Sequence, residues 1–357
     1  MKNKFMNCIL TVLLITVACF LLEATGAQAG SIKGNVLDEL SSTPIGNLLV
    51  GTYADDDEKS LIKSVLTDIG TGEYILDNLP DGTYKVVFFT YHTDYIQEWY
   101  SGGTDVYNFA DAEPVSVSGT AEKDLGNILL KKGAKITGTV TEEDSLGGVK
   151  ISGVLAMAYD ADGNWATSAK LTGDDGVYSL GGLRTGDYRI QFRAAFTGYA
   201  SEWYLDKYTL NTADTMTISS LNDELVSDVE LGPGDSISGE VIDSKGTAIV
   251  GAVVKVYDSN SDSTDSPIGI VTTGGDGTYV VAGLPLTKTF RVQFFEREGD
   301  GSGAGFTEWY NDKRNFDSAD IVSLGAGGTG ATGVDAMLEP NFNWWLFTPA
   351  LTHRPTP

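Results

Sequence analysis

Three copies of one short motif contain the residues of this chain that are best suited to chemistry. Glutamate, tryptophan and tyrosine follow one another about every hundred residues, as Glu98-Trp99-Tyr100, Glu202-Trp203-Tyr204 and Glu308-Trp309-Tyr310. An exposed tryptophan and tyrosine beside a carboxylate can stack on a sugar ring and hydrogen-bond its hydroxyl groups. These nine residues are therefore candidate ligand-binding residues.

The same motif has a structural interpretation. A tryptophan lying over the end of a small domain would bury its ring, and a nearby acid would fix a loop. Each copy is followed some ten residues later by an alanine and an aspartate, as Ala110-Asp111, Ala213-Asp214 and Ala319-Asp320. A repeated tryptophan in a domain without disulfides usually belongs to the core, which favours this interpretation and leaves the binding alternative open.

Acidic side chains also gather in one loop of each unit. They are Asp55 and Asp57, Asp160 and Asp162, and Asp258 and Asp262. Hard oxygen ligands at flexible spacing suit calcium, which extracellular modules bind weakly. None of the clusters has the twelve-residue EF-hand spacing with its final glutamate. Solvated turn residues are the favoured interpretation, and calcium is the one cofactor that stays open.

The residues needed for catalysis are incomplete. The chain has two histidines, of which His92 has no counterpart in the second copy and His353 lies near the C-terminus. A serine triad or a histidine metal cluster needs partners that the sequence does not supply. Glycoside hydrolysis needs paired carboxylates, whereas the glutamate of the repeated motif occurs once per unit. We predict no catalytic residues and no enzymatic activity.

The N-terminus has the order of a secretory signal peptide. Lys2 and Lys4 precede an apolar run from Ile9 to Leu22, and small residues follow at Ala27-Gln28-Ala29. We predict a signal peptide over residues 1–29 with cleavage before Gly30. A membrane anchor is the alternative, although the apolar run is short for a bilayer span. Export places the protein outside the cell or in the periplasm, with the cell surface as a further option.

Composition narrows the classes of partner. The formal net charge is −25 at pH 7, which argues against nucleic acid, because phosphate binding needs clustered lysine and arginine. Both cysteines, Cys8 and Cys19, lie in the predicted signal peptide, so the mature chain would form no disulfide. No later stretch is apolar enough to cross a bilayer. An extracellular glycan or protein surface remains a possible partner.

Alternating apolar residues predict short strands throughout each unit. The units open at Gly34, Gly138 and Gly239 with a two-residue period, and each continues through a tyrosine-leucine-leucine segment, over residues 72–84, 176–188 and 277–285. A closing strand is expected at 128–130, 229–231 and 336–338. No segment of the repeats has a sustained helical period, so we predict antiparallel β-sandwiches with almost no helix.

The repeat length predicts three tandem domains. Their boundaries are placed at 30–132, 133–233 and 234–340, followed by a C-terminal tail over 341–357. The joins Lys131-Lys132-Gly133 and Gly232-Pro233-Gly234 lie a few residues before the next opening strand. Short joins favour domains in a stiff row over domains on flexible tethers.

These motifs resemble the carboxypeptidase regulatory-like domains. The resemblance rests on the opening Ile-x-Gly-x-Val and on Gly-x-Tyr-x-Leu-x-x-Leu-Pro-x-Gly-x-Tyr, and it covers nearly all of residues 31–340 in three copies. The family is related to transthyretin-like and collagen-adhesin B-type domains. The resemblance implies all-β, prealbumin-like sandwiches without catalytic activity, because the family serves as a companion module in many proteins.

The leading prediction is a non-enzymatic secreted or surface protein whose tandem domains act as a structural, adhesive or spacer element. Export, triplication and the missing catalytic residues support it. One alternative is an array of carbohydrate-binding modules that uses Trp99, Trp203 and Trp309. Another alternative is an accessory regulatory subunit of a separate hydrolase.

Overall fold

The computed structural model describes residues 29–90, 93–166, 169–261, 266–295, 307–325 and 330–338. Within these ranges the regular structure is β-strand, apart from two single-turn 3-10 helices at Asp144–Leu146 and Leu210–Thr212. No helix in the described part of the chain has the length and apolarity needed to cross a membrane. Residues 1–28 of the predicted signal peptide, His92, Asp262 and the C-terminal tail lie outside the described residues.

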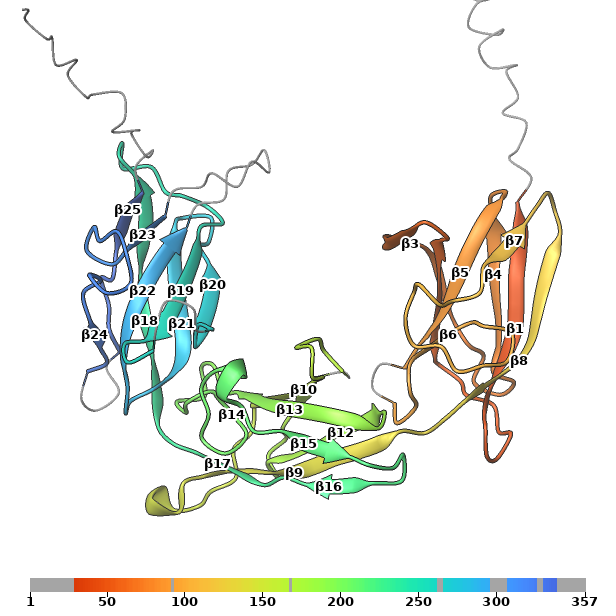
Figure 1. Cartoon of the computed structure of the whole chain (residues 1–357), viewed down its shortest axis with the longest axis horizontal. Coiled ribbons are helices and arrows are strands. Elements are labelled where there is room, and N and C mark those ends of the chain that lie inside the picture. Colours follow the sequence, from red (N-terminus) through yellow and green to blue (C-terminus); the bar gives the residue numbers. More distant parts are fainter. Residues whose placement is uncertain are drawn as a thin grey trace, which may run out of the picture. The chain divides into compact units, whose positions relative to one another are not determined.

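The first sandwich consists of a three-stranded and a five-stranded sheet (Figure 1). The smaller sheet has the order β4-β1-β8, with β1 at Gly30–Asp38, β4 at Glu73–Leu79 and β8 at Glu122–Leu130. The larger sheet has the order β3-β2-β5-β6, and β7 also pairs with β5. Its strands are β2 (Leu49–Ala54), β3 (Asp57–Leu66), β5 (Gly82–Phe89), β6 (Glu98–Trp99) and β7 (Val115–Val117).

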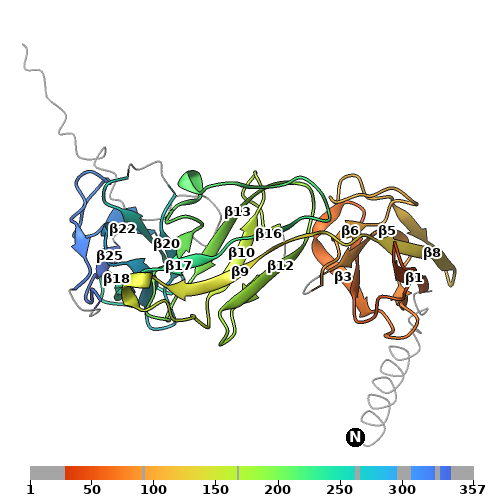
Figure 2. The same ribbon diagram turned by 90° about the horizontal axis from the view of Figure 1, so that it is seen from below.

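The second sandwich repeats this plan, and the pairing of β10 with β13 can be followed in Figure 2. Its smaller sheet has the order β12-β9-β16, with β17 also on β9. These strands are β9 (Ala134–Glu142), β12 (Val177–Leu183), β16 (Glu224–Val226) and β17 (Val229–Leu231). The larger sheet has the order β11-β10-β13-β14, with β15 on β13. Its strands are β10 (Leu155–Tyr159), β11 (Lys170–Leu171), β13 (Gly186–Arg193), β14 (Glu202–Trp203) and β15 (Met216–Ile218).

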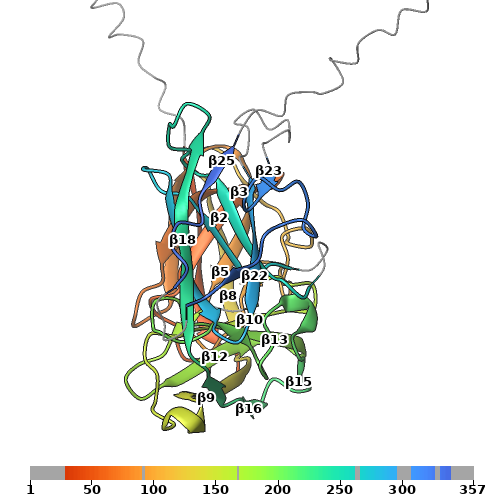
Figure 3. The same cartoon turned by 90° about the vertical axis from the view of Figure 1, so that its left-hand side faces the viewer.

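The third sandwich has the same strand order, and Figure 3 shows β18 beside β25. Its smaller sheet is β21-β18-β25, made of β18 (Gly234–Asp243), β21 (Thr278–Pro285) and β25 (Ala336–Leu338). Its larger sheet is β20-β19-β22-β23, with β24 on β22. These strands are β19 (Val253–Asp258), β20 (Gly269–Thr272), β22 (Thr289–Phe295), β23 (Thr307–Trp309) and β24 (Val322–Ser323).

The predicted fold class of three tandem β-sandwiches is confirmed, with one addition. The opening strand pairs antiparallel with the tyrosine strand in the first and third sandwiches. In all three sandwiches it pairs parallel with the closing strand, as β1 with β8, β9 with β17 and β18 with β25. The chain reaches β8 and β25 from the five-stranded sheet, and it reaches β17 from β16, which lies on the same opening strand β9, so no tight hairpin imposes an antiparallel direction there.

Each sandwich buries the predicted tyrosine and leucines between its two sheets. In the second sandwich Tyr178 is 2% exposed, and Leu180 and Leu183 are fully buried. The Tyr178 ring meets Phe192 edge to face at a centroid distance of 5.3 Å, and Tyr74 with Phe88 and Tyr279 with Phe294 repeat this contact. The repeated tyrosine therefore anchors the inner core of every copy.

The recurring glycine of the opening strand provides the space for this tyrosine. A Cβ atom at Gly138 would lie 2.2 Å from the Ser227 carbonyl oxygen and 3.0 Å from the Tyr178 ring. The Tyr178 hydroxyl donates a hydrogen bond of 2.6 Å to that same carbonyl. In the third sandwich Tyr279 donates an equivalent bond to Val334. Glycine recurs at this position because any side chain would displace the closing segment.

A buried threonine recurs as well, and sequence reasoning did not identify it. Thr172 is 3% exposed, and its hydroxyl accepts from the Val154 N–H at 3.0 Å and donates to the Ile151 carbonyl at 2.8 Å. Thr67 and Thr273 make the same two bonds in the other copies. The hydroxyl thus satisfies two backbone groups that have been removed from water.

We expect Gly138→Ala to destabilise the second sandwich by about 1–3 kcal/mol, because the new methyl group overpacks the space between the tyrosine and the closing segment. Gly275→Ala is the matched control, since a Cβ atom at this exposed glycine would have no neighbour within 4 Å. Denaturant unfolding followed by tryptophan fluorescence would measure both. Equal unfolding midpoints for the two variants would contradict this explanation of the glycine.

Candidate functional site

The glutamate and the tryptophan of the repeated motif point to opposite faces of the five-stranded sheet. They form the two-residue strand β6 and its counterparts in β14 and β23. Glu98 lies opposite Phe88 of the inner core, whereas Trp99 lies opposite Val87. Glu202 and Glu308 pair with Phe192 and Phe294 in the same way. Because neighbouring residues of a strand alternate between faces, each glutamate enters the sandwich and each tryptophan lies outside it.

Each tryptophan is nevertheless buried. Trp99, Trp203 and Trp309 are 9%, 6% and 6% exposed. Each packs on a tyrosine that lies two strands away in the same sheet, Tyr53 of β2, Tyr159 of β10 or Tyr257 of β19, at centroid distances of 5.6, 5.0 and 5.3 Å. We call these contacts the outer aromatic clusters. They form a second apolar layer on the face of the larger sheet that is turned away from the smaller one.

The loop that follows the motif covers this layer. In the first sandwich Phe109 meets Trp99 edge to face at 5.3 Å, and in the third Phe316 meets Trp309 at 5.4 Å. A basic side chain lies over the loop ring in both copies, with the Lys85 Nζ atom 4.3 Å from the Phe109 centroid. The corresponding distance from Arg291 to Phe316 is 4.5 Å. These cation–π contacts fasten the loop to the sheet.

The alanine and aspartate pair that the sequence suggested for the first copy, Ala110-Asp111, is not the structural counterpart of the pairs in the other two copies. The buried alanines of the covering loop are Ala112, Ala213 and Ala319. Three residues after each alanine, the chain pairs with the third or second residue of β5, β13 or β22. The pairs are Val115 with Tyr84, Met216 with Tyr188 and Val322 with Phe290. Ala112-Glu113 is therefore the counterpart of Ala213-Asp214, and the exposed Ala110-Asp111 is not. The spacing from the tryptophan to this alanine is three residues longer in the first copy, because the turn that returns the chain to Trp99 ends at Val106, whereas the turns after Trp203 and Trp309 end at Lys207 and Lys313.

Burial of the indole rings favours the structural interpretation of the motif over a stacking platform. A sugar would need an open ring face, and these rings are covered by the tyrosine and the loop. Tyr100, Tyr204 and Tyr310 are half-buried. Ligand binding by the nine motif residues stays a prediction.

Two of the motif glutamates are buried without full hydrogen bonding. Glu98 is 6% exposed and Glu202 is 2% exposed, and the Oε1 atom of each has no hydrogen-bond partner. Desolvation, reinforced by the charge of Asp105 and partly offset by Lys131, raises the pKa of Glu98 to about 7. Glu308 of the third copy is half-buried. Burial of a carboxyl group with an unpaired oxygen lowers the stability of the fold, so Glu98 and Glu202 are candidate functional residues.

The pKa of Glu202 has a similar cause. Desolvation comes first, and the charges of Asp206 and Glu143 add to it, so that the pKa rises to about 8. The backbone N–H of Asp206 opposes the rise by donating to the carboxylate. Leu205 and Asp206 both have positive φ angles, of 62° and 57°. The turn thus adopts a left-handed conformation that is unfavourable for leucine and that aims this N–H at the glutamate.

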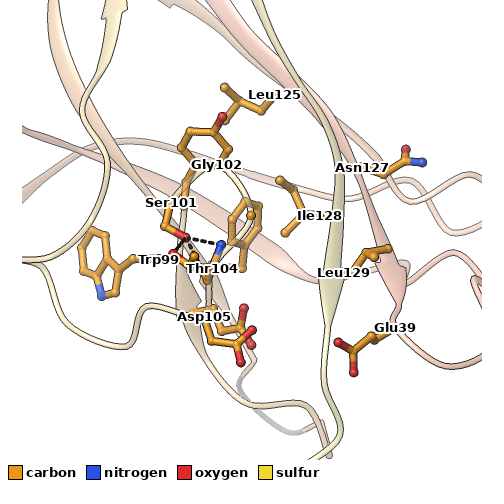
Figure 4. A pocket seen from close by; sticks show the side chains of 14 residues that line it. Glu39, Trp99, Ser101, Gly102, Thr104, Asp105, Leu125, Asn127, Ile128 and Leu129 are labelled. Atoms are coloured by element: carbon orange, nitrogen blue, oxygen red, sulfur yellow. Dashed lines mark hydrogen bonds between the residues drawn. The ribbon is translucent and has the colours of Figure 1, made fainter.

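Each of these glutamates lines a cleft between its motif and the closing strand. The first cleft has a volume of about 270 Å³ and is lined by Glu98 and by residues of the turn and of β8, among them Asp105 and Asn127. Figure 4 shows the Trp99 indole directed away from Ile128 and Leu129 of that strand. Trp99 thus lines the first cleft, although its indole ring packs in the outer aromatic cluster.

The second cleft, of about 510 Å³, lies at the corresponding place in the second sandwich. Its lining includes Glu202, Glu143, Asp206, Asp228 and Glu230. Sequence reasoning identified Glu202, but it did not place this residue beside Asp228 and Glu230 of the closing segment. A possible signal was the acid that follows the opening strand in the first two copies, Glu39 and Glu143. The pairing of these opening strands with the distant closing strands is visible only in three dimensions.

The predicted calcium candidates form turns. Asp160 accepts hydrogen bonds from the backbone N–H groups of Asp162 and Asn164 at 3.0 and 2.8 Å. Asp57 accepts a hydrogen bond of 2.9 Å from the backbone N–H of Lys59 in the same manner. Asp55 lies 3.4 Å from Lys85, and Asp258 forms an ion pair with Lys288. Within the described ranges no group of three or more acidic, histidine or cysteine side chains is arranged to hold a metal ion.

We expect the stability of the protein to fall between about pH 4.5 and pH 8 because of Glu202. Its pKa is about 8 in the folded state against 4.5 ordinarily, so in this window the unfolded chain loses the proton and the folded chain keeps it. The contribution of the Glu202 carboxyl group to the free energy of unfolding is greatest below this window and smallest above it.

Glu202→Gln, which mimics the neutral carboxyl group, should therefore raise the thermal midpoint more at pH 8.5 than at pH 5. Glu224→Gln, at an exposed glutamate of the same sandwich, is the control. Calorimetric scans at both pH values would test the difference. An equal gain at both would show that the carboxyl group is charged in the folded state throughout.

Comparison with known proteins gives similarity in structure only. No protein-family model matches the chain, and no curated protein matches it. The Bacillus anthracis TIE protein and a streptococcal ancillary pilin are each 13% identical to the chain, with a TM-score of 0.25 over 87% of its length. The chain spans 50% of the TIE protein and 99% of the ancillary pilin. The shaft pilin SpaA from Lactobacillus rhamnosus GG is 10% identical with a TM-score of 0.27, over 58% of this chain and 97% of that one. Similarity at this level does not extend to function.

Proposed function

We propose that this is a non-enzymatic secreted or surface protein in which three carboxypeptidase regulatory-like sandwiches serve as a structural, adhesive or spacer element. The observation that carries the proposal is that most of the residues recurring in all three copies are used to build the sandwich. Gly138 and Tyr178 set the distance to the closing segment, Thr172 satisfies two backbone groups, and Trp203 fills the outer aromatic cluster. The recurrence of residues with structural roles is what repetition of a stable domain would produce.

The surroundings of such a protein follow from the sequence. A signal peptide over residues 1–29 would deliver it to the cell exterior or periplasm. The net charge of −25 keeps acidic domains soluble and makes nucleic acid an unsuitable partner. Extracellular glycan or protein surfaces are the partners that an adhesive role would require. Domain boundaries at 30–132, 133–233 and 234–340 complete the proposal.

The function can be tested by a binding screen on the purified protein, with and without calcium. The panel would contain glycans, matrix proteins and whole cells. Adhesion is supported by saturable binding to one class of surface, and a spacer role by a folded, protease-resistant protein that binds none. Turnover of a polymer or peptide during the screen would overturn the non-enzymatic assignment.

Tryptophan substitution separates the structural role from an array of carbohydrate-binding modules. Trp203→Ala should destabilise its sandwich by about 3–5 kcal/mol, because it empties the centre of a buried aromatic cluster. Trp165→Ala is the matched control in the same domain, since this tryptophan is 66% exposed. Unfolding midpoints and glycan binding would be measured for both variants. A stable Trp203→Ala protein that has lost glycan binding would establish the carbohydrate-binding alternative.

A further inference from the structure

The first and second clefts differ in the charges at their mouths. In the first cleft Lys131 forms an ion pair with Asp105 and lies 3.7 Å from Glu39. The positive charge partly offsets the rise in the pKa of Glu98. The first sandwich therefore supplies its own cation beside the buried carboxyl group.

The second sandwich lacks this cation. The parallel registers of the closing strands place Gly232 where the first copy has Lys131, and Glu230 where it has Leu129. A Cβ atom at Gly232 would lie 2.6 Å from Glu143 Oε1, so position 232 faces the counterpart of Glu39. The substitution pattern removes one positive charge from the mouth and adds a negative one.

No positive side chain replaces it among the described residues that line the second cleft. The charged residues there are Glu143, Glu202, Asp206, Asp228 and Glu230. The charge of Glu202 also raises the pKa of the neighbouring Tyr208, after desolvation. Lys207, the next residue after Asp206, pairs with Asp214 at 3.5 Å. The cleft is thus lined by acidic residues, and one of them, Glu202, has a buried carboxyl oxygen, Oε1, without a hydrogen-bond partner.

We propose that the second cleft binds an alkylammonium group, either of a free amine or of a lysine side chain, through an ion pair and hydrogen bond to Glu202 Oε1. An ammonium group offers three donors on a narrow stem, which suits one deep oxygen surrounded by further acids. A charge-assisted hydrogen bond would satisfy the atom that the folded chain leaves unpaired. The site goes beyond the proposed structural role and does not depend on it.

Binding of a cation at this position must be linked to a proton. The raised pKa keeps Glu202 protonated at neutral pH, and an ammonium ion favours the carboxylate. Each binding event therefore releases close to one proton below about pH 8. In that range the dissociation constant of the alkylammonium ion should fall about tenfold for each unit by which the pH is raised, because the amine stays charged throughout.

Calorimetric titration of the purified protein with n-butylamine at pH 6 and pH 7, in about 150 mM salt, tests the proposal. We expect saturable binding that is about tenfold tighter at pH 7 and that releases protons to the buffer. Tetramethylammonium, which has the charge without an N–H donor, should bind at least tenfold more weakly. Nα-acetyl-lysine amide forms the second arm. Binding as tight as that of butylamine assigns the site to a lysine side chain, and much weaker binding assigns it to a free amine.

Three variants make the test specific. Glu202→Gln should weaken binding at least tenfold and abolish its pH dependence. Gly232→Lys should also weaken it, because it restores the internal cation of the first copy in a backbone conformation open to any residue. Glu98→Gln is the matched control and should leave binding unchanged.

The proposal is overturned by pH-independent binding, by equal losses in Glu98→Gln and Glu202→Gln, or by binding that Gly232→Lys does not affect. The first two results would indicate general attraction to an acidic protein. Circular dichroism on each variant confirms its fold, and the pH dependence of the unmodified protein remains decisive if a variant does not fold.

Discussion

Each sandwich depends on the burial of both faces of its five-stranded sheet. The three-stranded sheet covers only one face, and a single sheet face cannot hold a β-domain of this size together on its own. The short edge strand supplies the solution through its alternation, with the glutamate directed inward beside phenylalanine and the tryptophan directed outward. The following loop then covers the tryptophan with an alanine and, in two copies, a phenylalanine. Two apolar layers thus share one sheet.

This arrangement explains which aspects of the fold could be predicted from the sequence. The two-residue periods of the opening and tyrosine strands reflect burial on one face, so both strands and their inward residues were foreseeable. The glycine was recognised as a landmark, but its reason, a close approach of Tyr178 and Ser227, depends on a residue far along the chain. The buried threonine escaped because one polar residue after a strand resembles an ordinary turn residue.

The candidate site was predictable in its residues and not in its geometry. The triplet Glu202-Trp203-Tyr204 is conspicuous in the sequence, yet its neighbours cannot reveal that the tryptophan and the glutamate serve different layers. That separation follows from a strand of only two residues, which is too short to show a period. The cleft needs in addition the parallel pairing of β17 with β9, a contact between segments almost ninety residues apart.

The buried glutamate is the part of this design that packing does not explain. A leucine beside Phe192 would fill the inner core without a desolvation cost, and an unpaired carboxyl group lowers stability as soon as it ionises. In the first copy Lys131 moderates this cost from within the chain. In the second copy a glycine takes the place of that lysine, so the backbone N–H of Asp206 offsets part of the cost but no cation does so among the described residues that line the cleft. A residue that destabilises the free domain when it ionises, and that gains an ion pair when a cation is added, has the energetics of a binding site, because binding supplies the interaction that folding leaves unmade.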